Sequence, residues 1–100
     1  MNDFVLATNG DGRLEAFYVE NSTVQHTWQL SPSDPLSWSN PGPLYVGNNP
    51  PLSNVTEVGA CTSGSGFIHV VARTSDGSYY LCYQVENAGN WQGWFPITQS

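Results

Sequence analysis

The sequence predicts an all-β fold built from two similar four-stranded antiparallel units, and three observations support this prediction. Every strong hydrophobic periodicity has a period of two residues, which is typical of strands and not of helices. Turn-forming residues interrupt the chain at short intervals, as they do between short antiparallel strands. The two halves also align with each other as a repeat of roughly 50 residues, the spacing at which the blades of a β-propeller recur.

Eight strands are expected in chain order, four in each half. They are 4–8, 13–19, 24–30 and a short strand near 43–45, followed by 55–62, 67–74, 79–85 and 95–98. The turns between them carry residues that tolerate positive φ angles, namely Asn-Gly-Asp-Gly at 9–12, Ser-Gly-Ser-Gly at 63–66 and Asp76-Gly77.

The internal repeat is the most informative feature of the sequence. Residues 12–17 align with residues 66–71 at an offset of 54, and Trp38 aligns with Trp91 at an offset of 53. The offset changes only across turns, where insertions are tolerated. We therefore expect two propeller blades, residues 1–48 and residues 49–100, that form one structural unit.

Two blades leave two sheet faces uncovered. The strand at 13–19 carries Leu14, Ala16 and Tyr18 on one face and Phe17 on the other, so both faces need burial. A homo-oligomer that closes a ring satisfies this need, with three chains and six blades as the first choice and four chains and eight blades as the next. The alternative is a self-contained two-sheet sandwich, in which the repeat would be accidental.

Charge and hydropathy exclude several kinds of partner. The net charge of −6, with Arg13 and Arg73 as the two basic residues, disfavours nucleic acid and anionic membrane surfaces. No apolar run approaches the roughly 20 residues that span a bilayer, so membrane insertion is not expected. The first four residues lack the features of a signal peptide, which leaves the localisation open between the cytoplasm and a non-classical export route.

The two cysteines are expected to be free thiols. Cys61 and Cys82 fall in the first and third strands of the second unit, with the strand 67–74 between them. Strands separated by one neighbour lie about 10 Å apart, which is beyond the reach of a disulfide.

No pattern of catalytic or metal-binding residues stands out, so we expect neither an enzyme nor a bound metal or cofactor. His26 and His69 are isolated, and no nucleophile elbow accompanies them. Histidine and cysteine do not occur at the close spacing of a metal site. The carboxylates of a glycosidase could come from Glu15, Glu20, Glu57 or Glu86, but their spacing singles out no pair.

Three sequence elements carry a family resemblance. The run ATNGDGRLEAF at 7–17, the run HTWQ at 26–29 and Trp38-Ser39 occur in this order and resemble the repeat of Photorhabdus-type β-propeller lectins. The second half keeps the later part of the pattern in Tyr83-Gln84 and in NWQGWFPI at 90–97. The resemblance covers nearly the whole chain. Some of its elements also appear in tectonin-type and fungal fucose-binding propellers.

The resemblance implies a ring with sugar sites at the boundaries between blades, recognising fucose or related monosaccharides. Short bacterial fucose lectins have two-blade chains of similar length and close a six-bladed ring as trimers. This sequence departs from the repeat where Pro41 stands against Trp94, where Phe67 and His69 stand against Arg13 and Glu15, and where Leu81 stands against His26. We therefore expect the main sugar site to involve the first blade, completed by residues of an adjoining blade.

Sugar recognition combines aromatic rings, which cover the apolar face of a pyranose, with a few fixed polar groups that pair its hydroxyls. The candidate sugar-binding residues are Arg13, Glu15, His26, Trp28, Gln29, Trp38, His69, Tyr83, Gln84, Trp91 and Trp94. Two questions stay open at this point: whether the tryptophans belong to the core or to a site, and whether Arg13 and Glu15 form an ion pair with each other.

The sequence therefore predicts a carbohydrate-binding lectin without catalytic activity, made multivalent by homo-oligomerisation, with glycans as its partners. The runner-up is a structural or protein-binding propeller that has lost sugar binding. A glycosidase is a distant third.

Overall fold

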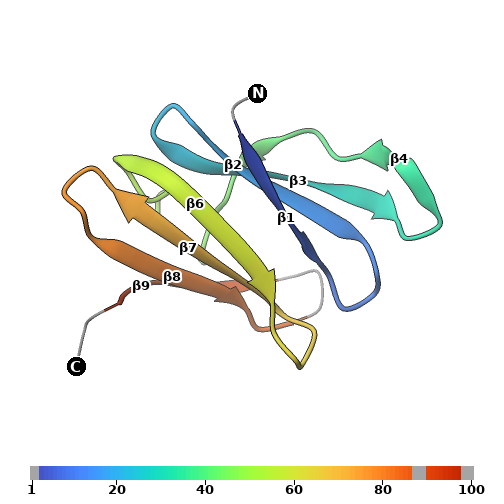
Figure 1. Cartoon of the computed structure of the whole chain (residues 1–100). Helices are drawn as coiled ribbons and strands as arrows, with labels where there is room; N and C mark the ends of the chain where they lie inside the picture. Colours follow the sequence, from blue (N-terminus) through green and yellow to red (C-terminus); the bar gives the residue numbers. More distant parts are fainter. Residues whose placement is uncertain (1–2, 87–89, 98–100) are drawn as a thin grey trace.

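The computed structural model describes residues 3–86 and 90–97, which form two antiparallel sheets and no helix (Figure 1). The first sheet has the order β1 (Phe4–Thr8), β2 (Leu14–Glu20), β3 (Thr23–Ser31) and β4 (Asp34–Trp38), and the two-residue strand β5 (Gly42–Pro43) also pairs with β3. The second sheet has the order β6 (Val55–Thr62), β7 (Ile68–Thr74), β8 (Tyr79–Gln84) and β9 (Trp91–Pro96). The all-β prediction is confirmed. Within the described residues, no helix has the length and hydropathy to cross a membrane.

Two of the expected strands need correction. The fourth strand of the first sheet is β4, whereas the expected segment 43–45 contributes only the short pairing of β5 with Gln25 and His26. β4 was not predicted because it contains Pro35, a residue that sheets tolerate only at an edge or an irregularity. The last strand begins at Trp91 instead of 95, and the expected Thr98 lies outside the described residues. A shift in register between Leu81 and Tyr83 obscures the alternation there.

The two sheets repeat each other in their hydrogen bonds as well as in sequence. The amide of Leu14 donates to Oε1 of Gln29 at 2.7 Å, and the amide of Ile68 donates to Oε1 of Gln84 at 2.8 Å. In each sheet this bond ties the start of the second strand to the end of the third. The structure therefore preserves the repeat at the level of individual side chains.

The core lies between the sheets. Phe17 and Val24 of the first sheet and Ile68 and Val70 of the second are at most 2% exposed and belong to one hydrophobic cluster. The connection between the sheets adds its own apolar side chains to this cluster, including Leu44. One face of each sheet is thus covered by the other sheet, and we call this the inner face. Two consecutive propeller blades and a two-sheet sandwich share this arrangement.

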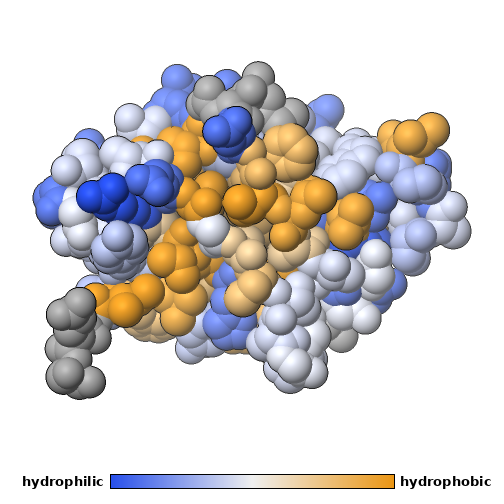
Figure 2. All heavy atoms as spheres, in the orientation of Figure 1, coloured by the Kyte–Doolittle hydropathy of each residue, from blue (hydrophilic) through white to orange (hydrophobic). Residues whose placement is uncertain are grey.

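The edge strands β1 and β6 lie side by side at the front of the molecule (Figure 1). Thr62 Oγ1 donates to the carbonyl of Thr8 at 2.7 Å, and it accepts from the amide of Thr8 at 3.0 Å, which ties the ends of the two strands together. Figure 2 shows that apolar side chains gather over this region. Besides packing face to face, the two sheets therefore contact each other along the edge strands β1 and β6.

Candidate inter-sheet binding site

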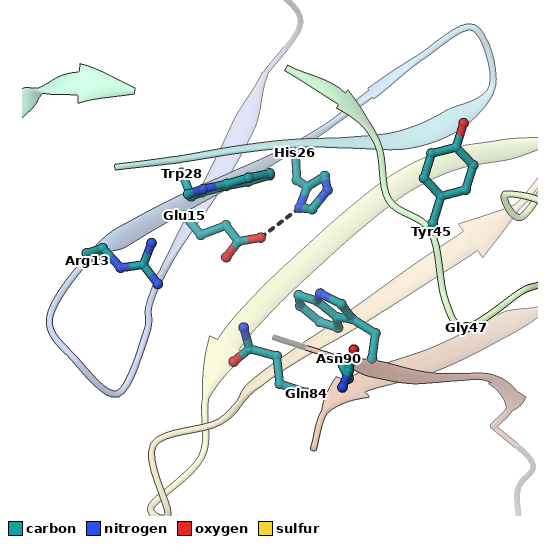
Figure 3. Close-up of a pocket in the computed structure, with 9 residues that line it drawn as sticks. Arg13, Glu15, His26, Trp28, Tyr45, Gly47, Gln84 and Asn90 are labelled. Atoms are coloured by element: carbon teal, nitrogen blue, oxygen red, sulfur yellow. Dashed lines mark hydrogen bonds and ion pairs between the residues drawn. The ribbon is translucent and has the colours of Figure 1, made fainter. Parts of the chain in front are cut away.

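A pocket of about 430 Å³ opens between the two sheets (Figure 3). Its lining residues come from both sheets and from the connection between them: Arg13, Glu15, His26, Trp28, Tyr45, Gly47, Gln84, Asn90 and Trp91. Six of the eleven residues predicted from the sequence are among them.

A carboxylate and an imidazole meet on the wall formed by the first sheet. Glu15 of β2 lies opposite Trp28 of β3, and Phe17 lies opposite His26, so strand alternation places all four side chains on the inner face. Oε2 of Glu15 lies 2.7 Å from Nδ1 of His26, as the dashed line in Figure 3 marks. Only 4% of Glu15 is exposed, so this pair is held in a rigid, largely dehydrated setting.

Asn9 connects this pair to the second sheet, a role that was not predicted from the sequence. Its side-chain amide donates to Oε1 of Glu15 at 3.1 Å, and its Oδ1 accepts from Nε2 of Gln84 at 2.9 Å. Asn9, Glu15 and Gln84 are each at most 4% exposed. A buried polar network therefore joins the sheets beside the pocket. The sequence predicted only a turn at 9–12. Ser63, which aligns with Asn9 in the repeat, has no side-chain amide that could indicate such a bridge.

Arg13 is oriented by Asp11 and not by Glu15. Its Nε donates to Oδ2 of Asp11 at 2.8 Å, and its Nη1 donates to the carbonyl of Gln29 at 3.3 Å. The sequence left open whether Arg13 pairs with Glu15, and the structure shows that the ion-pair partner of Arg13 is Asp11. Burial acts to raise the pKa of Asp11, but hydrogen bonds and charge from Arg13 outweigh it and hold that pKa below its usual range.

The aromatic walls come from both sheets. The ring of Trp28 lies 4.9 Å from that of His26 at a tilt of 49°, and Trp91 packs edge-on against Phe17 at 5.9 Å. Trp28 and Trp91 are both partly exposed, so they belong to the pocket and not to the interior of the core. Tyr45, which is 60% exposed, approaches from the connection between the sheets (Figure 3).

Tyr45, Gly47 and Asn90 were not predicted. The burial of Leu44 and Val46 on either side of Tyr45 directs the tyrosine outward beside the pocket. The sequence shows this alternation of apolar residues but predicts from it only part of a strand. Asn90 directly precedes β9 and lies with Gln84 on the opposite wall from Glu15 (Figure 3).

Two predicted residues near the first sheet lie outside the pocket lining. Gln29 is 5% exposed, and its side chain binds the amide of Leu14 and the carbonyl of Pro35. Trp38 lies in the edge strand β4, where its indole Nε1 donates to the carbonyl of Pro35 at 3.0 Å.

The remaining predicted residues belong to other parts of the second sheet. His69 and Tyr83 stack on each other at 5.5 Å, and strand alternation places them on the face that points away from the first sheet. Trp94 packs against the hydrophobic cluster, where its indole N–H is buried without a hydrogen-bond partner.

The cysteine prediction is confirmed in its strand assignment. Cys61 lies in β6 and Cys82 in β8, with β7 between them, and both are free thiols. Burial raises the pKa of the Cys82 thiol, which keeps it protonated at neutral pH. Across the described residues, no group of three or more histidine, cysteine, aspartate or glutamate side chains is placed to hold a metal ion.

Comparison with known proteins identified no relative of this chain. No protein-family model matches the sequence, and no curated protein matches it.

The Asn9 bridge supports a test of the polar network. Asn9→Asp keeps the acceptor for Gln84 but places carboxylate oxygen where the amide nitrogen now lies, 3.1 Å from Glu15. We expect the free energy of unfolding at pH 7 to fall by about 2–4 kcal/mol, because a buried donor is replaced by a like charge.

The same variant should show a distinctive pH dependence. Two neighbouring carboxyl groups raise the pKa of one of them in the folded state. The destabilisation is therefore full above that raised pKa and relieved below it, so the difference from the parent should shrink as the pH falls from 7 towards 5. Urea unfolding across this range measures it. Asn49→Asp, the same change at an exposed position, is the control. An Asn9→Asp variant as stable as the control would contradict the assigned network.

Proposed function

We propose that this protein is a carbohydrate-binding lectin whose main site is the inter-sheet pocket and whose ligand is fucose or a related neutral monosaccharide. The observation that carries the proposal is the convergence in one pocket of two partly exposed tryptophans, Trp28 and Trp91, with Arg13 and the Glu15–His26 pair. Aromatic faces and rigidly held charged groups are the two features that sugar recognition requires.

The size of the pocket suits a small ligand. Its volume of about 430 Å³ lies towards the lower end of the roughly 300–1,000 Å³ that is common for small-molecule sites. A sugar ring can place its C–H face against tryptophan while its hydroxyls approach the carboxylate and the guanidinium. Two of the five N–H groups of Arg13 are engaged by Asp11 and the carbonyl of Gln29, which leaves others to donate to a ligand.

Binding without catalysis fits the acid groups of the site. Glu15 is the one carboxylate among the described residues that line the pocket. Hydrolysis of a glycoside normally uses two carboxyl groups on either side of the bond that breaks. The arrangement therefore favours a lectin over a glycosidase.

The proposal includes the architecture that the sequence resemblance implies. The two sheets are taken as consecutive blades of a propeller related to the Photorhabdus-type lectins, with the ring completed by other copies of the chain, three in preference to four. Each site should be weak, with a Kd in the range of about 1 mM to 1 μM, because a monosaccharide buries few atoms. Several sites on one assembly would then raise the avidity for a glycan-coated surface.

A glycan array followed by calorimetry tests this proposal. We expect the parent protein to bind neutral, fucose-containing glycans on the array and to bind free L-fucose with a dissociation constant in the range given above. The negative charge of sialylated and sulfated glycans should not raise their affinity for the protein, since the chain carries a net charge of −6. Binding to no glycan would reject the lectin and favour the structural or protein-binding module.

A further inference from the structure

The residues that line the inter-sheet pocket differ widely in exposure. Glu15 and Gln84 are 4% and 2% exposed, whereas Tyr45 is 60% exposed. Gly47 and Asn90, which line the pocket together with Tyr45, are exposed as well. The pocket therefore has a buried part that carries charged and amide groups and an open part beside the connection between the sheets.

The open part lies at one end of the pocket. The amide of Leu44 donates to the carbonyl of Val24 at 2.9 Å, which attaches the connection to β3. From Val24, β3 runs past His26 towards the carbonyl group that Arg13 binds. Figure 3 accordingly shows Tyr45 and Arg13 on opposite sides of the pocket, with His26 between them.

The exposed ring of Tyr45 stands on a backbone that is anchored on both sides. Leu44 and Val46 are 1% and 2% exposed and belong to the hydrophobic cluster. The carbonyl of Val46 also accepts from the amide of Asn49 at 3.2 Å. Because this backbone is already ordered, the ring can contact a ligand at a small cost in conformational entropy.

The two ends of the pocket offer a ligand different amounts of room. At the open end, Gly47 has no side chain, and a Cβ atom built there would meet no atom within 4 Å. At the opposite end, the Arg13 side chain is only 16% exposed and is fixed by Asp11 at 2.8 Å. A substituent on a bound sugar therefore has space to leave the pocket beside Tyr45.

Burial also sets the order of the units in a bound glycan. The hydroxyls of the recognised sugar have to reach the buried Glu15, whereas the bond to the rest of the glycan has to lead towards solvent. A terminal sugar meets both conditions, because its anomeric carbon carries its one glycosidic link. The unit next to it then comes to lie over Tyr45.

We propose that the open end of the pocket is a second subsite, in which the ring of Tyr45 covers the group attached to the anomeric carbon of the bound sugar. The ligand class is then a terminal fucoside whose linked group is a second ring, such as the next sugar of a glycan. This inference rests on the proposed function and adds the linked unit to it. A tyrosine suits the position, since its face contacts a ring while its hydroxyl stays in water.

Calorimetry with simple glycosides tests the second subsite. The probes are methyl and phenyl L-fucoside, each in both anomeric forms, and the phenyl group represents the second ring. For the anomer that points its substituent towards Tyr45, we expect the parent to bind the phenyl glycoside about threefold to tenfold more tightly than the methyl glycoside, the gain of one aromatic contact. Tyr45→Ala should reduce this affinity ratio to about one, and Tyr45→Phe should keep it.

The ratio is the readout because any effect of a substitution on the sugar itself cancels in it. Tyr79→Ala is the matched control, since it removes a tyrosine that is 48% exposed at the start of β8, and it should keep the ratio of the parent. Circular dichroism checks that each variant folds.

The possible failures are distinguishable. A ratio of about one for both anomers in the parent, or a Tyr45→Ala variant with the ratio of the parent, would overturn the second subsite and leave the sugar site in place. If none of the four glycosides binds the parent, the proposed function fails and the subsite fails with it.

Discussion

Replacing Gly93 by alanine is expected to lower the free energy of unfolding by about 3 kcal/mol or more, which is the cost of severe overpacking combined with backbone strain. Gly93 lies in β9 with a φ angle of +146°, a conformation that residues with a side chain rarely adopt. A Cβ atom there would lie 2.6 Å from Cβ of Cys82 and 2.8 Å from both its Cα and the carbonyl oxygen of Leu81. Two of these atoms belong to the backbone of β8, so relief would require β8 and β9 to separate.

Urea unfolding followed by tryptophan fluorescence measures this effect. Gly64→Ala is the matched control, because its added Cβ meets no atom within 4 Å. The control should change stability by less than about 1 kcal/mol, as is usual for a surface substitution. If the two variants are equally stable, the close approach of β9 to β8 at Gly93 is not a feature of the folded protein in solution.

Strand positions were predictable where local signals agree. β1 and β6 match the expected residues because turn-forming residues follow each of them directly, at 9–12 and at 63–66. β4 was missed because it contains Pro35, and because the side-chain bonds within this strand are not visible in the sequence. Ser37 donates to Asp34 at 2.7 Å, and Trp38 binds the carbonyl of Pro35. Such bonds leave no periodic trace in the sequence.

The candidate site was likewise predictable only where local sequence signals determine it. Glu15, His26 and Trp28 could be grouped from the sequence, because strand alternation and one hairpin register bring them together. Tyr45 and Asn9 could not, since their positions depend on contacts with distant elements: the burial of Leu44 for the first and the bond to Gln84 for the second. The repeat did identify His69 and Tyr83 as counterparts of pocket residues. It could not show that these two residues lie on the face of the second sheet that points away from the first sheet.

Replacing Glu15 by glutamine is expected to weaken fucose binding about tenfold to a hundredfold, equivalent to about 1.4–2.7 kcal/mol, because a charge-assisted acceptor is lost at a buried position. The substitution preserves shape. The new carbonyl can still accept from the amide of Asn9, and the new NH₂ group can donate to Nδ1 of His26, which then carries its proton on Nε2. The fold should therefore survive while the negative charge at the pocket disappears. Calorimetric titration with L-fucose measures the loss of affinity.

The comparison variant for this experiment is Glu20→Gln, which removes the same charge at the exposed end of β2. Both variants lose one negative charge, so any effect of net charge alone appears equally in the two. We expect Glu20→Gln to bind fucose like the parent, because charges separated by more than a Debye length of about 8 Å are largely screened at physiological salt. A Glu15→Gln variant that keeps the assembly and the affinity of the parent would move the sugar site away from the inter-sheet pocket. Selective loss in Glu15→Gln would instead tie recognition to the carboxylate that Asn9 and His26 hold in place.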